Sequence, residues 1–465
     1  LFVSAAKQSE DSQLRLTGFT AHEWTQQSFL AADADTLAKN LRANPLGPLD
    51  RDSFGYDLAQ VQYLRALSPR TNMTASVFYQ RGYGWYRLSD DQYGLDGLLI
   101  GSMLTMSTTR GPWTANYGLH VNEFRREHTL DSGGERAYAN YGTKGEANAF
   151  AKLRYDASRW HVYSDAQLRT TNFAYHGDVA IAPVRWIFFN PKLGARYDLS
   201  SSSSIFTSAG ISTREPTRND LFQGEDNASF AHDLHAVRPE RVVDLEAGWD
   251  ARRGPLTVSA NVYAMEFRHE IASTGELSNI GLLLRRNVDR SYRRGIELEY
   301  AWQARPVLRL RGNASLSRNR IHTWTQFYDV YDAAGNVIGS QPIAYQDVNP
   351  VLTPTMIVNQ TFEYTPSSSI TLGVTGRHVG RSYLDNTNNG SFVAPAFTTV
   401  DANVGIALSR NAHVRVQVNN VLNDKRIFPS GYSYLFLTPA KTISGISYYY
   451  PQATRNAVVM VDFRH

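Results

Sequence analysis

The stretch "VLRLRGNASLS", residues 307–317, alternates strictly between two kinds of side chain. The residues of one parity are small or apolar and those of the other are polar: Leu308, Leu310, Ala314 and Leu316 against Arg309, Arg311, Asn313, Ser315 and Ser317. Successive side chains of a β-strand point to opposite faces, so this alternation predicts a strand with one apolar and one polar face. A protein core would exclude the arginines, which indicates that the polar face meets water.

The same two-faced pattern recurs far away in the chain, at 256–263, 371–377 and 413–419. These segments approach the roughly 9–11 residues that a tilted strand needs to cross a bilayer. A soluble β-sandwich also alternates, but it buries its apolar face and leaves its polar face to water. Strand length and charges on the inner parity favour a transmembrane β-barrel with a wet interior over this soluble alternative.

Short turns and longer loops follow one another along the chain. Short connections rich in Ser, Asp, Gly or Pro begin near 8, 68, 109, 156, 198, 251, 304, 365 and 409, and such residues supply turn conformations or cannot continue a ladder. Longer polar loops are expected at 27–51, 88–95, 129–142, 174–185, 215–238, 271–286, 325–351, 382–396 and 428–452. Short turns at one end and long loops at the other are typical of outer-membrane β-barrels.

Aromatic residues gather beside the short turns, and most of them share the apolar parity: Tyr155, Trp160, Tyr197, Trp249, Tyr300, Trp302 and Tyr364. Tyrosine and tryptophan side chains have an apolar body and a polar tip, which suits the boundary between lipid and water. These residues therefore predict an interfacial girdle at the short-turn end of a barrel.

The composition excludes several classes of protein. Cysteine is absent, which rules out a disulfide scaffold and thiol chemistry. A net charge of +4 over 465 residues gives no support for a nucleic-acid partner. No linker or charge block divides the chain, so we expect one domain over residues 1–465.

The segments add up to about nineteen antiparallel strands, whereas single-chain bacterial barrels have an even number. The first residues, "LFVSAAKQ", also lack the basic and apolar regions of a signal peptide. We therefore expect an all-β transmembrane antiparallel barrel of about twenty-two strands, truncated at its N terminus. The short turns would then face the periplasm and the long loops the exterior.

Five stretches resemble the barrel of TonB-dependent outer-membrane receptors. They are "NPKLGARYDLSSSSSIFTSAGISTREPTRNDLF" at 190–222, "VRPERVVDLEAGWD" at 237–250, "NVDRSYRRGIELEYAW" at 287–302, "GRHVGRSYLDNT" at 376–387 and "VNNVLNDKRIF" at 418–428. Each is a weak signal alone, but their order and spacing extend the resemblance over essentially the whole chain.

The resemblance implies a receptor that binds a scarce nutrient at the cell surface, most often a ferric siderophore. Its expected partners are the TonB complex of the inner membrane, outer-membrane lipid and the metal-chelate ligand, and we expect a monomer. Family members also carry an N-terminal plug domain and a TonB box. We expect neither in residues 1–465, because strands, turns and loops use the whole chain. A resident cofactor, a metal site and enzymatic activity are not expected, and the transported ligand would be an iron chelate.

Arginine and aromatic residues at strand ends and in long loops are the candidate ligand-binding residues, because such surfaces attract anionic chelates and stack on planar ones. They are Arg214, Arg218, Arg268, His269, Arg285, Arg286, Trp324, Tyr328, Tyr331, Arg377, Arg381, Tyr432 and Tyr434. Structural roles compete with this interpretation. Barrel arginines also pair with carboxylates such as Asp244 and Glu297, and loop aromatics also pack on one another.

Other functions stay open at this point. A plugless passive porin would need no TonB energy, and a receptor of the same family could carry cobalamin, haem or a glycan. An adhesive or enzymatic barrel would need loops or motifs that the sequence does not offer, since it has no nucleophile elbow or phosphate-binding loop. "FAHDLH" at 230–235 and "DNTNNG" at 385–390 have metal-binding residue types, but solvated loop and turn roles explain them more simply.

Overall fold

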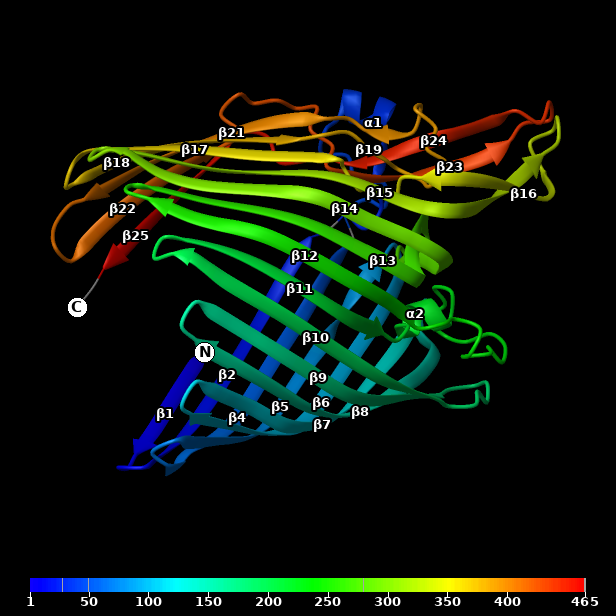
Figure 1. Cartoon of the computed structure of the whole chain (residues 1–465). Coiled ribbons are helices and arrows are strands. Elements are labelled where there is room, and N and C mark those ends of the chain that lie inside the picture. Colours follow the sequence, from blue (N-terminus) through cyan, green and yellow to red (C-terminus); the bar gives the residue numbers. More distant parts are fainter. Residues whose placement is uncertain (27, 49, 279, 464–465) are drawn as a thin grey trace.

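Long antiparallel strands, each hydrogen-bonded to the next, form a curved wall (Figure 1). The computed structural model describes residues 1–26, 28–48, 50–278 and 280–463. The wall strands, in order of pairing, are β1 (Phe2–Gln8), β2 (Ser12–Gln26), β4 (Arg51–Ser68), β5 (Thr71–Leu88), β6 (Asp91–Arg110), β7 (Trp113–Ser132), β8 (Glu135–Ala157), β9 (Trp160–His176), β10 (Val184–Ser200), β11 (Ser203–Arg214), β12 (Glu240–Arg253), β13 (Leu256–Leu277), β14 (Leu283–Arg305), β15 (Leu308–Tyr331), β17 (Met356–Ser367), β18 (Ile370–Val379), β21 (Phe397–Ala407), β22 (Ala412–Asn419) and β25 (Asn456–Phe463).

Shorter elements lie at the long-loop end of the wall, on the right of Figure 1. They are β3 (Ala32–Asp33), α1 (Ala34–Lys39), α2 (Arg218–Leu221), β16 (Val337–Val348), β19 (Ser382–Tyr383), β20 (Val393–Ala394), β23 (Ser430–Leu437) and β24 (Ile443–Tyr450). Among the residues that the structure describes, β19 and β20 form a separate two-stranded sheet, and the other strands belong to one sheet of 23 strands. Within the described residues, neither helix has the length and apolar character needed to cross a membrane.

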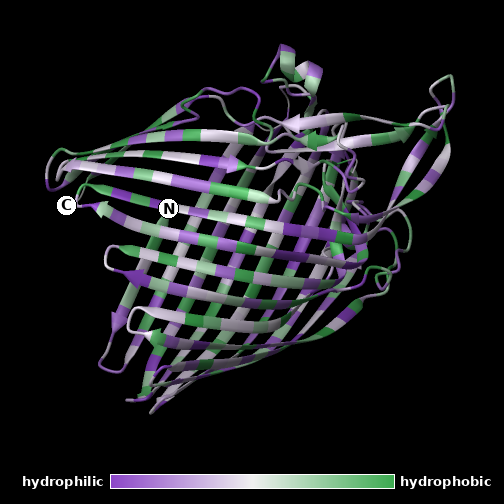
Figure 2. Cartoon of the chain, turned by 45° about the horizontal axis from the view of Figure 1, so that its top comes forward, coloured by the Kyte–Doolittle hydropathy of each residue, from purple (hydrophilic) through white to green (hydrophobic). Residues whose placement is uncertain are grey.

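The predicted all-β antiparallel architecture is confirmed, and the wall is barrel-like in shape (Figure 2). Among the described residues, β1 pairs with β2 alone and β25 pairs with β22 alone. The strand number of the intact barrel, its truncation and the absence of a plug remain predictions.

Hydrophilic and hydrophobic residues alternate along the wall strands, as the sequence predicts (Figure 2). Leu298 on β14 lies between Ala260 and Ala314 of the neighbouring strands and is 49% exposed. The next residue of β14, Glu299, has the opposite parity and lies between Ser259 and Asn313. Monomers that live in water rarely expose so continuous an apolar face, whereas lipid solvates it readily.

The predicted short turns each join two consecutive wall strands, and all lie at the end opposite to α2 (Figure 1). Glycine occupies the turn positions at which the backbone is left-handed: Gly111 and Gly254 have φ of +57° and +58°. Since turn residues act locally, these positions could be identified from sequence alone.

Several predicted long loops are wrong in extent, because the strands continue through them. β7 and β8 meet at the Gly133–Gly134 pair, so 129–142 is a strand hairpin rather than a loop. β5 and β6 shorten 88–95 to a tight turn in the same way. The segments 325–351 and 428–452 are also mostly strand, in the hairpins β15–β16 and β23–β24.

Candidate functional site

Two long hairpins meet at the rim of the wall, above β13 and β14. β15 runs parallel to β23, with Asp329 opposite Phe436 and Val330 opposite Leu437. A buried cluster of Tyr328, Phe392, Leu435 and Leu437 fastens them together. The structure therefore brings together 325–351 and 428–452, two of the segments from which the sequence analysis drew candidate ligand residues.

Polar aromatic groups cover the exposed side of this junction. The Tyr434 hydroxyl donates a hydrogen bond to Asp329 Oδ2 at 2.7 Å and lies 2.9 Å from the hydroxyl of Tyr331. Tyr331 and Phe436 pack edge to face with ring centroids 5.1 Å apart. Tyr434 is 38% exposed, so a ligand can reach its ring and hydroxyl. We call Asp329, Tyr331 and Tyr434 the rim triad.

Three predicted ligand residues near the rim triad make buried contacts within the fold instead: Arg286, Trp324 and Tyr328. The Arg286 guanidinium lies 3.8 Å from the centre of the Trp324 ring, which is 1% exposed. Trp324 Nε1 donates to Gln326 Oε1 at 3.0 Å, and Gln326 donates onward to Glu276 at 2.7 Å. Tyr328 is fully buried and its hydroxyl lies 2.5 Å from that of Tyr345. These predicted residues therefore support the rim from inside the fold.

The loop after β18 packs against the β23–β24 hairpin and holds it in place. Asp385 accepts hydrogen bonds from the Thr387 backbone at 2.8 Å and from the Ser433 hydroxyl at 2.8 Å, and burial raises the pKa of its carboxyl. Asn386 donates to the Ser273 carbonyl at 2.7 Å and accepts from Val351 N–H at 3.0 Å. The "DNTNNG" segment thus joins distant loops, a role that its turn-forming composition does not reveal.

A second group of polar contacts anchors the loop after β11. Arg218 donates to the Asn140 amide oxygen at 2.7 Å and to the Asp226 carbonyl, and burial lowers the pKa of its guanidinium. The Asp226 carboxylate bonds to His128 at 2.7 Å and accepts from the Tyr138 hydroxyl at 2.6 Å. Burial opposes the charged form of Asp226, but the His128 bond, the Tyr138 bond and the Arg218 charge outweigh it and lower its pKa. Arg218 therefore holds this loop in place.

Other predicted arginines pair with carboxylates. Arg214 lies 3.2 Å from Glu240, and Arg285 lies 3.8 Å from the buried Asp220. Between them in sequence, Glu215 accepts from Arg169 and from Lys144, the latter at 2.5 Å, and these contacts overcome the effect of burial and lower its pKa to about 2. An ion-pair network thus ties the β11 end to the inner wall.

The remaining candidates are spread over several places. Arg381 lies 5.6 Å from the Tyr383 ring, and Arg377 is exposed on β18. Tyr432 stacks on Tyr448 with centroids 5.0 Å apart. Arg268 and His269 lie on β13 away from the rim triad, and Arg238 lies 3.2 Å from the His269 ring. The described residues contain no group of three or more His, Asp or Glu side chains that could hold a metal ion.

Comparisons with known proteins agree with this architecture. The family described as "TonB dependent receptor-like, beta-barrel" matches residues 6–421. Among curated protein sequences, none matches this chain.

Solved structures share the fold at low sequence identity. The siderophore receptor PiuA from Acinetobacter baumannii is 12% identical with a TM-score of 0.73, over 97% of this chain and 72% of that one. The ferric-catecholate import receptor Fiu from E. coli K12, in its closed form, is 13% identical with a TM-score of 0.68, over the same shares. The copper transporter OprC is 15% identical with a TM-score of 0.70, over 99% of this chain and 70% of that one.

Members of the matched family are outer-membrane transport receptors rather than enzymes. The match covers most of the chain, and the two-faced strands and unequal ends of the structure are those that the alternation and the turn residues of the sequence predict. The chain belongs to the TonB-dependent receptor β-barrel family.

Proposed function

We propose that this protein is an outer-membrane receptor that binds a ferric siderophore or a similar metal chelate at its long-loop end and imports it with energy from TonB. The observation that carries the proposal is the rim triad, which two separate hairpins build at the exposed junction of β15 and β23. Solved structures of similar fold include receptors whose titles name ferric catecholates and ferric citrate.

The chemistry of the rim suits such a ligand. Tyrosine rings offer stacking faces with little conformational entropy to lose, which suits the planar rings of a catecholate chelate. Arg377 and Arg381 lie on and just after β18, whose following loop seats the β23–β24 hairpin, and add positive charge for an anionic chelate. Because Asp329 already accepts from Tyr434, the triad is arranged before a ligand arrives.

A growth and binding experiment tests the proposal. The full-length protein is expressed in a host that lacks its own iron receptors, with ferric citrate, a ferric catecholate or haem as the sole iron source. We expect growth on one of the two ferric chelates, and loss of that growth when TonB is deleted. Growth that persists without TonB would instead support a passive pore.

Two variants locate the binding surface. The double change Tyr331→Ala and Tyr434→Ala removes both rings from the rim, and we expect chelate affinity to fall at least tenfold. Phe230→Ala is the matched control, because Phe230 is an exposed long-loop aromatic outside the rim triad. Equal affinity for both variants and the wild type would exclude the rim triad as the ligand site.

A further inference from the structure

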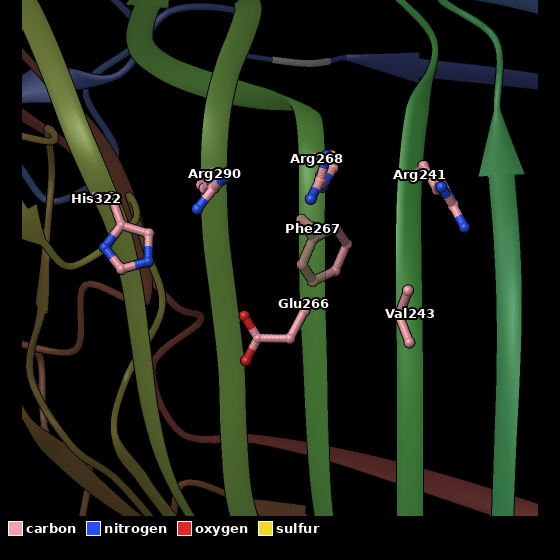
Figure 3. A pocket seen from close by; sticks show the side chains of 7 residues that line it. All are labelled: Arg241, Val243, Glu266, Phe267, Arg268, Arg290 and His322. Atoms are coloured by element: carbon pink, nitrogen blue, oxygen red, sulfur yellow. The ribbon is translucent and has the colours of Figure 1, made fainter.

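Three arginines lie directly opposite one another on neighbouring strands. Arg241 of β12 pairs with Arg268 of β13, which pairs in turn with Arg290 of β14. Figure 3 shows their side chains at one level, with His322 of β15 beside them. Together with Val243 and Glu266 they line an open cavity of about 500 Å³. We call Arg241, Arg268 and Arg290 the arginine row.

The arginine row lies on the apolar, outward face of the wall. On β13 and β14 its members have the parity of Val262 and Leu298, both of which are exposed apolar residues. The opposite parity carries Glu297 and Glu299, which face the polar interior. The row is therefore outside the barrel and cannot contact a ligand in the interior, so Arg268, a candidate ligand residue in the sequence, is assigned to the lipid-facing surface instead.

The height of the row places it at the upper edge of the apolar band. Trp302, near the short-turn end of β14, marks the lower edge. At about 3.3 Å per residue and a tilt of about 40°, Arg294 lies roughly 20 Å and Arg290 roughly 30 Å above Trp302 along the barrel axis. An apolar band is about 25 Å tall, so these residues bracket its upper boundary, where lipid headgroups begin.

The row has surplus positive charge. Among the described residues, none forms a hydrogen bond or ion pair with the side chain of Arg241, Arg268 or Arg290. Like charges directly opposite on paired strands destabilise a sheet. The nearby carboxylates are engaged elsewhere: Glu266 accepts from Arg294 at 2.9 Å, and Asp347 lies 3.2 Å from His322. Asp289 is exposed and lies 4.0 Å from His269.

We propose that the arginine row binds the phosphate groups of an anionic lipid in the leaflet around the long-loop end. Arginine binds phosphate through two parallel hydrogen bonds, and a row on three strands about 4.8 Å apart spans about 10 Å, the size of a lipid headgroup. Exposed apolar residues below the row offer contacts for the acyl chains. This inference rests on the proposed outer-membrane location.

The test measures lipid binding by the full-length protein in neutral detergent. The probes are bisphosphorylated lipid A, its phosphate-free counterpart, and inorganic phosphate. The triple variant Arg241→Gln, Arg268→Gln and Arg290→Gln removes the row. The matched control, Arg110→Gln, Arg159→Gln and Arg252→Gln, removes the same charge from the short-turn end. Glu266→Gln removes the carboxylate beside the row.

We expect the wild type and the control to bind bisphosphorylated lipid A at least tenfold more tightly than the triple variant does, and the phosphate-free lipid to bind all three alike. Glu266→Gln should raise the affinity about threefold, a gain that misfolding cannot produce. The inference would be overturned if the wild type bound the phosphate-free lipid as tightly as bisphosphorylated lipid A, or if the triple variant bound lipid A as tightly as the wild type. Inorganic phosphate binding as tightly as lipid A would also overturn it.

Chelate binding in the same samples separates this inference from the proposed function. The triple variant should keep wild-type affinity for the ferric chelate. If the wild type binds the chelate but does not prefer bisphosphorylated lipid A over the phosphate-free lipid, only the lipid inference is overturned. If it prefers bisphosphorylated lipid A but does not bind the chelate, only the proposed ligand is overturned.

Discussion

Glu266 and Glu270, four residues apart on β13, form ion pairs on opposite faces of the wall. Glu266 bonds to Arg294 at 2.9 Å, whereas Glu270 lies 2.6 Å from Arg293, the preceding residue of β14. An uninterrupted strand would place both glutamates on the same face. The alternation is reversed between them because His269 has a φ of +53°, so the outward arginine row gives way above His269 to side chains that face the interior.

The positive φ at His269 predicts an unusual response to substitution. Glycine adopts this conformation without strain, whereas a β-branched residue is disfavoured there by roughly 1–2 kcal/mol. We expect His269→Val to lower the free energy of unfolding in detergent by about that amount and His269→Gly to leave it unchanged or raised. Urea unfolding followed by tryptophan fluorescence measures both, and a more damaging glycine would show that the imidazole contacts matter more than the backbone.

The two faces of the wall should respond oppositely to an added charge. Leu298→Arg places a guanidinium near the middle of the apolar band, which costs roughly 2–4 kcal/mol in a barrel. Ser315→Arg is the matched change on the inner face, where Ser315 lies opposite Glu297 and can form an ion pair with it. Heat-modified mobility of protein refolded in lipid vesicles reports the folded fraction. Similar losses in both variants would contradict the assignment of the outward face.

Local sequence signals predicted the wall, and they did so because both alternation and turn residues act over a few positions. The rim could not be predicted this way. Residues 325–351 form a hairpin whose turn depends on Asp332, which accepts from the backbone N–H of Ala334 and Asn336 at 2.9 Å each. The parity reversal at His269 has no signal in the sequence either.

The roles of the candidate ligand residues could not be predicted from local sequence either. Arginine and aromatic residues in long loops were identified correctly as a class, but their roles depend on contacts between distant segments. Arg218 reaches Asn140, 78 residues away, and the hydroxyl of Tyr331 meets that of Tyr434, 103 residues away. Trp324 and Tyr434 are both aromatic candidates near the long-loop end, yet the first is buried and the second is exposed. Trp324 is buried because it packs against Ala272, Val288 and Val348 of β13, β14 and β16.

Asp226 is predicted to hold the loop after β11 closed. Asp226→Asn removes the negative charge that faces His128, Tyr138 and Arg218, and we expect the local stability of the loop to fall by about 1–3 kcal/mol. Faster hydrogen exchange at residues 219–232 would report this opening. Asp233→Asn is the control, because Asp233 is exposed on the same loop and its carboxylate accepts, among the described residues, only from the His235 backbone at 2.9 Å. Equal exchange in both variants would exclude the role of Asp226.

The same carboxylate predicts an acid sensitivity of the loop. The folded-state pKa of Asp226 lies below its ordinary value, so its contribution is fully present above about pH 4 and is lost as the pH falls through the folded value. In the wild type, the hydrogen-exchange rate at residues 219–232, corrected for intrinsic rates, should therefore not change between pH 5 and 7 through titration of Asp226. It should rise below about pH 4. The Asp226→Asn variant should lack that step.

Tyr434 and Tyr328 provide the sharpest test of the rim triad, since both are hydroxyl-bearing rings at the same junction. Tyr434→Phe keeps the ring but removes the hydroxyl that joins Asp329 to Tyr331. The triad is then no longer arranged before the ligand binds, and a loss of about 1 kcal/mol predicts roughly fivefold weaker chelate binding. Tyr328→Phe removes a buried hydroxyl that pairs with Tyr345, so it should lower stability and leave affinity within twofold. Titration of the ferric chelate against protein fluorescence measures both, and a larger affinity loss from Tyr328→Phe would place the ligand beneath the rim instead of on it.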